Sequence, residues 1–316
     1  MKNSRYPLLV LKGIAMGAAD VIPGVSGGTI AFITGIYEEL LDSIKSIDLQ
    51  AVKLFFTGKW KSFWKKINGN FLLSVVAGIA ISVFSLARLM TYLLETHPIP
   101  VWSFFFGLII ASSFLVAKDV SKWNWKTVLA AVAGAVAGYG ITALSPATTP
   151  DAWWFIILSG AIAICAMILP GISGSFILLL LGKYEYVMEA VGELNIGVIL
   201  LFLVGAVAGI ISFSHFLSWL LKRYRNVTIA VLMGFMIGSL NKIWPWKEVL
   251  ETYIDSHGEM QPFKEANILP HTYEAINQTS AQLGQAVGLC VVGFLLVIVI
   301  EAIGRRMKKR AGTPES

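Results

Sequence analysis

The stretch GAADVIPGVSGGTIAFITGIYEEL, residues 17–40, places an Asp, a Pro and several Gly inside an otherwise apolar segment. Pro–Gly interrupts a helix because Pro lacks an amide donor and Gly lacks a side chain. The stretch MILPGISGSFILLLLGKYEYV, residues 167–187, repeats the pattern with Pro170 in the place of Pro23. The chain is therefore predicted to contain two similarly broken helices and an internal duplication.

The composition is that of a membrane protein. Of the 316 residues 56% are hydrophobic and only 14% are charged, with a mean hydropathy of +0.72. Soluble domains carry about 25% charged residues. A nucleic-acid-binding function is excluded because no basic soluble domain is present. The two cysteines lie inside apolar runs and show no metal-ligand spacing, so no metal, cofactor or catalytic group is predicted.

Apolar runs of about 20 residues predict helices that cross a bilayer. The motif regions instead suggest re-entrant helical hairpins, because each is too long for one crossing and is broken at Pro–Gly. We predict an all-α polytopic membrane protein forming one integrated membrane domain. Its first half, 1–145, has a hairpin at 6–44 and crossings at 71–94, 101–117 and 127–145. Its second half, 146–316, has a hairpin at 152–191 and crossings at 197–221, 227–243 and 282–303.

The duplication predicts an inverted repeat. AGIAISVFS (77–85) resembles AGIISFSHF (208–216), and FFFGLIIASS (104–113) resembles VLMGFMIGSL (231–240). Each unit holds one hairpin and three crossings, and three is odd, so the second copy is inserted upside down, as in many secondary transporters.

The basic residues support this topology. If the hairpins are re-entrant, nineteen of the 25 Lys and Arg lie on the side of the amino terminus and three lie on the other, in the 241–281 loop. Positive charge marks the cytoplasmic side. We therefore predict a multi-pass protein of the bacterial cytoplasmic (inner) membrane with both termini cytoplasmic.

The residues after each break are suited to binding an anion. The amides of a helix's first turn have no intrahelical partner and carry partial positive charge, and small residues let an oxyanion approach them. Meeting near the bilayer midplane, the two tips would form a phosphate cradle. The predicted phosphate-binding residues are Ser26, Gly27, Gly28 and Thr29 with Ser173, Gly174 and Ser175, and the predicted breaks are Pro23, Gly24, Pro170 and Gly171.

Charged residues inside the membrane are candidates for function because an unpaired buried charge is costly. We predict that Arg88 or Lys12 neutralises substrate charge, and that Asp20 and Glu38 couple transport to protons or another cation such as sodium. The alternatives are that Arg88 and Lys12 extend to the interface and that Asp20 only caps the broken helix.

The residues KGIAMGAADVIPGVSGGTIAFITGIYEELLDSI (12–44), the second motif and GFMIGSLNKIWPW (234–246) together resemble the bacterial polyprenyl-phosphate transporter family, long known as a domain of unknown function. The resemblance covers roughly residues 6–245. It implies a flippase that returns undecaprenyl phosphate, the lipid carrier of peptidoglycan and other envelope polymers, from the outer to the cytoplasmic leaflet. Such a protein would work among membrane lipids and would not be an enzyme.

Two alternatives remain at this stage. PGVSGGTI is also similar to the PGxSRSG motif of the integral undecaprenyl-diphosphate phosphatases, but Gly27 and Gly174 replace the Arg of that motif and no ExxxE pair precedes it. A channel or exchanger for a small inorganic anion would use the same kind of helix ends.

Overall fold

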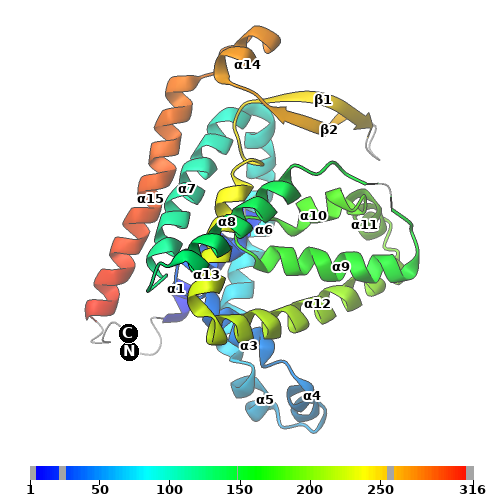
Figure 1. Cartoon of the computed structure of the whole chain (residues 1–316). Coiled ribbons are helices and arrows are strands. Elements are labelled where there is room, and N and C mark those ends of the chain that lie inside the picture. Colours follow the sequence, from blue (N-terminus) through cyan, green and yellow to red (C-terminus); the bar gives the residue numbers. More distant parts are fainter. Residues whose placement is uncertain (1–4, 21–25, 148, 255–259, 311–316) are drawn as a thin grey trace.

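The computed structural model describes residues 5–20, 26–147, 149–254 and 260–310, and it is mostly helical (Figure 1). The elements in chain order are α1 (Arg5–Asp20), α2 (Gly27–Ile33), α3 (Tyr37–Lys45), α4 (Leu49–Phe56), α5 (Trp60–Lys66), α6 (Gly69–Thr96), α7 (Pro98–Lys118), α8 (Trp125–Thr142), α9 (Trp153–Ile168), α10 (Gly174–Leu180), α11 (Tyr184–Gly192), α12 (Ile196–Arg223), α13 (Arg225–Ser239), β1 (Lys247–Ile254), β2 (Met260–Asn267), α14 (Pro270–Asn277) and α15 (Leu283–Arg310).

In the second motif region α9 ends at Ile168 and α10 begins at Gly174. In the first, α1 ends at Asp20 and α2 begins at Gly27, with residues 21–25 outside the described part of the chain. The helices α2 and α3 have the same lengths and the same spacing as α10 and α11, seven and nine residues with three residues between them. Each motif region therefore has two short helices after its Pro–Gly pair. Gly35 and its counterpart Gly182 have φ of +70° and +59°, a left-handed conformation that ends the short helix and starts the next one.

Four of the six predicted crossings coincide with described helices that are long and apolar enough to span a membrane. These spans are Gly69–Leu86, Pro98–Lys118, Ile196–Arg223 and Leu283–Ala302. The other two predicted crossings correspond to α8 and α13, which have 18 and 15 residues. At 1.5 Å per residue, helices of that length reach across only about 27 and 22 Å.

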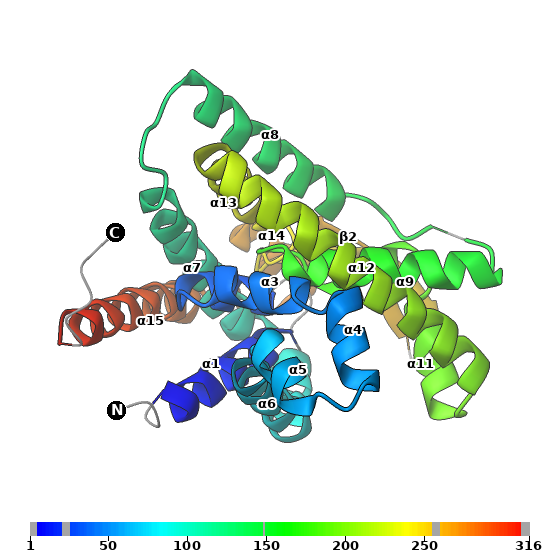
Figure 2. The same ribbon diagram turned by 90° about the horizontal axis from the view of Figure 1, so that it is seen from below.

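The helices pack in four main pairs, and the pairing itself repeats. In the first half α1 packs on α6, and in the second half the equivalent helices α9 and α12 pack together. The remaining pairs exchange partners between the halves, because α7 packs on α15 and α13 packs on α8. Figure 2 shows these pairs spreading from the middle of the molecule.

Glycines allow the exchanged pairs to approach closely, and they do so at matching positions. A Cβ atom at Gly107 of α7 would collide with the Cys290 carbonyl oxygen of α15. A Cβ atom at Gly234 of α13 would collide in the same way with the Ala131 carbonyl oxygen of α8. Small residues serve this purpose in membrane helices, where tight packing replaces the hydrophobic effect as the source of association.

The all-α prediction missed a two-stranded antiparallel sheet. Strands β1 and β2 pair from Lys247 with Asn267 to Ile254 with Met260, with irregular register on either side of Glu251. This hairpin and α14 form the predicted 241–281 loop. They lie at the end of the molecule opposite the beginning of α1, the end of α15 and the short helices α4 and α5 (Figure 1). Mixed polar and apolar residues concealed the strands, because the alternation is broken where the register shifts.

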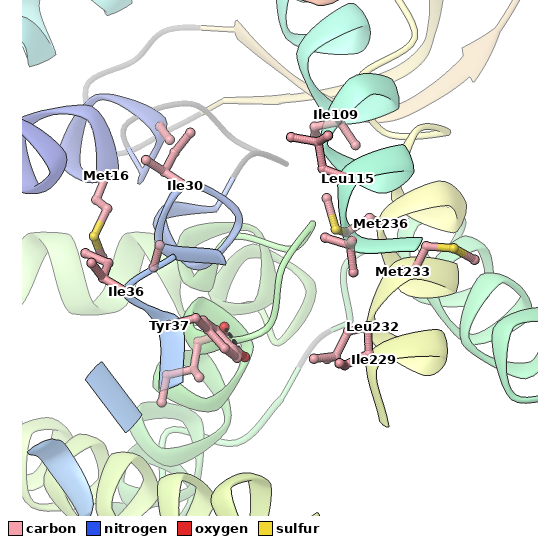
Figure 3. Close-up of a cluster of buried hydrophobic side chains, with 14 of the residues drawn as sticks. Met16, Ile30, Ile36, Tyr37, Ile109, Leu115, Ile229, Leu232, Met233 and Met236 are labelled. Atoms are coloured by element: carbon pink, nitrogen blue, oxygen red, sulfur yellow. Dashed lines mark hydrogen bonds between the residues drawn. The ribbon is translucent and has the colours of Figure 1, made fainter. Parts of the chain in front are cut away.

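The largest apolar core joins the first hairpin to both exchanged pairs. Met16, Ile30 and Tyr37 of α1–α3 are buried together with Ile109 of α7 and Met236 of α13 (Figure 3). This packing holds the first broken helix against the second half of the chain.

Candidate functional site

The first broken helix begins again at Ser26, which caps α2. Ser26 has extended backbone angles (φ −126°, ψ 135°), and its Oγ accepts a hydrogen bond from the Gly28 amide at 3.0 Å. The Ser hydroxyl therefore satisfies one of the amides that a helix start leaves without a partner. Ser26 and Thr29 are fully buried.

Asp20, the last residue of α1, holds another amide of the same helix start. Its Oδ1 accepts a hydrogen bond from the Gly27 amide at 2.7 Å. A carboxylate at this position has the charge that a helix amino terminus favours. The protein's own side chain thus occupies the place where the sequence predicts a substrate anion. Pro23 and Gly24 lie outside the described residues.

The two breaks lie against each other. Ser26 Oγ donates to the Met167 carbonyl oxygen at 2.9 Å, and Tyr37 Oη donates to the Ile168 carbonyl oxygen at 3.1 Å. Both carbonyls belong to the last turn of α9, which has no intrahelical donors for them. The first hairpin therefore caps the helix that ends at the second break.

A third hydrogen bond joins the tips in the opposite direction. The Gly171 amide donates to Thr29 Oγ1 at 3.1 Å, and Gly171 has φ of +96°, which lets the chain turn sharply after Pro170. A Cβ atom at Gly28 would collide with the Ile168 carbonyl oxygen, so this glycine is required for the close approach.

The second broken helix begins again at Ser173 and is more open. Ser173 Oγ accepts a hydrogen bond from the Phe176 amide at 3.4 Å and lies 2.6 Å from Ser175 Oγ. Within the described part of the chain, the amides of Gly174 and Ser175 have no hydrogen-bond acceptor. Both residues are half-buried, whereas Ser26 to Thr29 are buried. The residue equivalent to Asp20 here is Met167, so no carboxylate covers this helix start.

Of the predicted charged residues, Asp20 lies at a helix start, whereas Lys12 and Glu38 lie away from both helix starts. Lys12 Nζ donates to the Thr34 carbonyl oxygen at 2.6 Å, at the carboxyl end of α2. Glu38 forms an ion pair with Arg225 Nη1 at 2.6 Å, on the side of α3 that faces α13. Arg88 lies in α6, and its side chain is outside the described part of the structure.

Sequence reasoning missed the role of Tyr37 and treated three lysines of the 241–281 loop only as markers of topology. Tyr37 could have been suspected because its counterpart Tyr184 stands at the same position of the repeat. A binding role for the lysines could have been suspected because they are the only basic residues predicted to lie on the outer side of the membrane.

These features define a class: an α-helical membrane protein built around two interrupted helices whose broken ends meet. The sequence model of the VCA0040-like family, described as undecaprenyl phosphate translocase-like, matches residues 16–261, and the chain belongs to this family. It is 48% identical over 300 residues to a protein of Vibrio cholerae named polyprenyl-phosphate transporter, covering 95% of this chain and 97% of the relative.

A second relative confirms the assignment. A Staphylococcus aureus protein, also named polyprenyl-phosphate transporter, is 34% identical to this chain over 256 residues. The match covers 75% of this chain and 85% of the relative. The family resemblance predicted from the motifs is therefore confirmed. Both relatives are named as transporters and not as enzymes, in agreement with the prediction that this chain is not an enzyme. No solved structure matches the chain.

Proposed function

We propose that this protein transports a polyprenyl phosphate, specifically undecaprenyl phosphate, from the outer to the cytoplasmic leaflet of the bacterial cytoplasmic membrane. Its family and the names of both relatives support the substrate class. Such a lipid has an anionic head and a long apolar tail. Its carrier must shelter the head inside the protein while the tail stays among membrane lipids.

The observation that carries the proposal is the junction of the two breaks. The amides of Gly174 and Ser175 open a helix beside this junction and lack acceptors among the described residues. Oriented amides and the helix dipole favour an anion at such a position. In the proposal, the phosphate binds first at these amides and then contacts the Ser26 to Thr29 helix start.

Asp20 is the coupling group in this proposal. Its carboxylate accepts from the Gly27 amide, so it and a phosphate oxygen compete for the same donor. A proton on Asp20 removes the charge that holds it there, because a neutral acceptor binds an amide more weakly than an ionised one. Protonation thereby frees the amide for the substrate. Sodium is the alternative coupling ion, and the ion dependence of transport distinguishes the two.

The halves 1–145 and 146–316 act as inverted repeats in the proposed mechanism. Matched helix pairs and matched glycine contacts support the equivalence of the halves. Both hairpins are proposed to be re-entrant, with their tips near the bilayer midplane. Both termini are proposed to be cytoplasmic.

In the proposal, ion pairs hold the inner end closed. Glu38 pairs with Arg225, and Asp42 pairs with Lys222 at 3.0 Å, so α3 of the first half is tied to α13 and α12 of the second. Burial alone would raise the pKa of Asp42, but hydrogen bonds from Lys222 and Ser218 outweigh it and hold that pKa below its ordinary value. Partly exposed pairs of this kind contribute about 0–1 kcal/mol each, so they can open without a large barrier. In the proposal Glu38 is a gate residue.

Reconstitution tests the proposal. The purified full chain in liposomes should deplete labelled polyprenyl phosphate from the accessible leaflet without releasing inorganic phosphate. Replacing both Ser173 and Ser175 with Ala should slow this movement, because it removes the two hydroxyls beside the Gly174 and Ser175 amides, whereas Ser74→Ala should not. Ser74 is a suitable control because it is half-buried, like Ser175, and its hydroxyl donates to the Asn70 carbonyl oxygen of its own helix, α6. Released phosphate would identify an enzyme, and anion flux without lipid movement an exchanger; either result refutes the proposal.

A further inference from the structure

A cavity of about 320 Å³ lies at the end of the molecule that carries the β hairpin, away from the tips described above. Residues from the carboxyl end of α8, the short helix α10 and the strands β1 and β2 line it. Its volume falls in the range of small-molecule binding pockets, about 300–1,000 Å³. We call it the outer lysine pocket, because Lys242, Lys247 and Lys264 line it.

Two of these lysines share one carboxylate. Lys242 Nζ and Lys247 Nζ each lie 3.0 Å from Glu265 Oε2. The ammonium groups are also held over aromatic rings, Lys242 at 5.0 Å from the Phe176 centroid and Lys247 at 5.2 Å from the Trp102 centroid. Aromatic faces attract cations and fix their positions without neutralising them.

The pocket therefore carries excess positive charge. Three lysines and one carboxylate, that of Glu265, line the pocket. Lys264 forms an ion pair with Glu251, which is not a lining residue, at 3.7 Å, and both of these side chains are about half exposed. Burial, and then the neighbouring Lys242, lower the pKa of Lys247 to about 8, although Glu265 opposes this shift. Burial disfavours the charged form of a lysine, and a neighbouring lysine disfavours it further.

Polar groups and an apolar edge complete the pocket. Asn267 Nδ2 donates to Asn241 Oδ1 at 2.9 Å, and both side chains line the cavity. The lining residues Tyr139, in the last turn of α8, and Leu144, just after it, are exposed by 57% and 61%. A lipid with its head in the pocket would have its tail beside these apolar side chains.

We propose that the outer lysine pocket is a second anion site, which binds the phosphate monoester group of the lipid before it reaches the helix breaks. This inference rests on the proposed function for its choice of lipid. A phosphate monoester carries a charge of about −1.5 to −2 at neutral pH. Among the lining residues, three lysines and Glu265 leave two positive charges, one of which is partly offset by the half-exposed Glu251 beside Lys264. The site and the head group are therefore of opposite charge without loss of Glu265.

The pocket is also well placed for delivery to the second break. Phe176, which lies under Lys242, follows Ser175 directly in α10. Lys242 therefore lies beside the same short helix whose first amides belong to Gly174 and Ser175. The two sites form consecutive steps, loading in the pocket and then transfer to the breaks.

Binding measurements on the full chain in detergent test the proposal. The probes are inorganic phosphate, farnesyl phosphate and uncharged farnesol, at one ionic strength. Replacing both Lys242 and Lys247 with Gln should weaken farnesyl phosphate binding at least tenfold, and Glu265→Gln should strengthen it. Lys126→Gln is the matched control, because Lys126 is an exposed lysine on α8 that lies over the Trp125 ring. If the lysine variant folds poorly, Lys264→Gln and Glu265→Gln carry the test.

The outcomes separate the two possible sources of the phosphate group. Lysine-dependent binding of farnesyl phosphate well above that of inorganic phosphate supports a lipid head group, whereas equal binding of both supports a site for phosphate itself. Unchanged binding in the lysine variants overturns the inference.

Failure of the inference and failure of the proposed function are distinguishable. If wild-type and lysine-variant proteins move polyprenyl phosphate equally well in liposomes, the proposed phosphate site in the pocket is refuted. The proposed transport function is then unaffected. A wild-type protein that binds farnesyl phosphate in the pocket but moves no lipid refutes the transporter and leaves the pocket.

Discussion

Replacing Asp20 with Asn tests whether this side chain competes with the substrate. In the structure its Oδ1 accepts from the Gly27 amide at 2.7 Å. Asn keeps a neutral oxygen at the same place and nearly the same volume, so the fold is expected to persist. What the substitution removes is the negative charge beside the start of α2.

The size of the expected effect on phosphate binding follows from replacing a charged acceptor of the Gly27 amide with a neutral one. A hydrogen bond to a charged group contributes about 1.5–3 kcal/mol, and a neutral one contributes about 0.5–1.5 kcal/mol. Breaking the hydrogen bond from the Gly27 amide therefore costs about 1–1.5 kcal/mol less when residue 20 is Asn than when it is Asp. This difference corresponds to roughly a tenfold change in the binding constant of the competing phosphate. Asp20→Asn should bind farnesyl phosphate about tenfold more tightly than the parent protein. The dependence of binding on the protonation of Asp20 should disappear.

The assay is equilibrium binding of farnesyl phosphate over a range of pH. It uses protein in which Lys242 and Lys247 are Gln, so that the outer lysine pocket does not contribute. Asp42→Asn is the matched control, because it makes the same chemical change at the inner end, where Asp42 pairs with Lys222. Weaker binding by the Asp20 variant, or an unchanged dependence on pH, would refute the competition and leave Asp20 as a structural cap.

Further predictions concern packing, charge and topology. Ser26→Ala should lower the free energy of unfolding by about 1–2 kcal/mol, because it removes a helix cap and leaves the Met167 carbonyl unsatisfied; chemical denaturation checks this. Gly234→Ala should destabilise by about 1–3 kcal/mol through overpacking against α8, and a thermal melt unchanged from wild type would contradict it. Phosphate binding in the pocket should weaken as pH rises through about 8, where Lys247 loses its charge, and Lys247→Arg should abolish that loss. Cysteines placed at Lys61 and Thr252 should react with impermeant reagents from opposite sides of the membrane, whereas labelling from one side would refute the topology.

The sequence determined the local breaks and their repetition. Pro–Gly, the capping Ser26 and Ser173, and the glycines that end α2 and α10 act on their own backbone, so their effect can be read from adjacent residues. The apolar runs likewise predicted the long helices to within a few residues. The strands of the β hairpin were not recognised, because their pairing breaks register near Glu251.

Only the tertiary structure decided which groups meet. The sequence left Asp20 as either a cap or a coupling group, and the fold places its carboxylate on the Gly27 amide. In the fold, Lys12 contacts the carboxyl end of α2, and Lys242 and Lys247 both pair with Glu265. The physical reason is that residue type fixes what a group can bind. Its partner, across a turn or more than a hundred residues away, is fixed by how the helices pack.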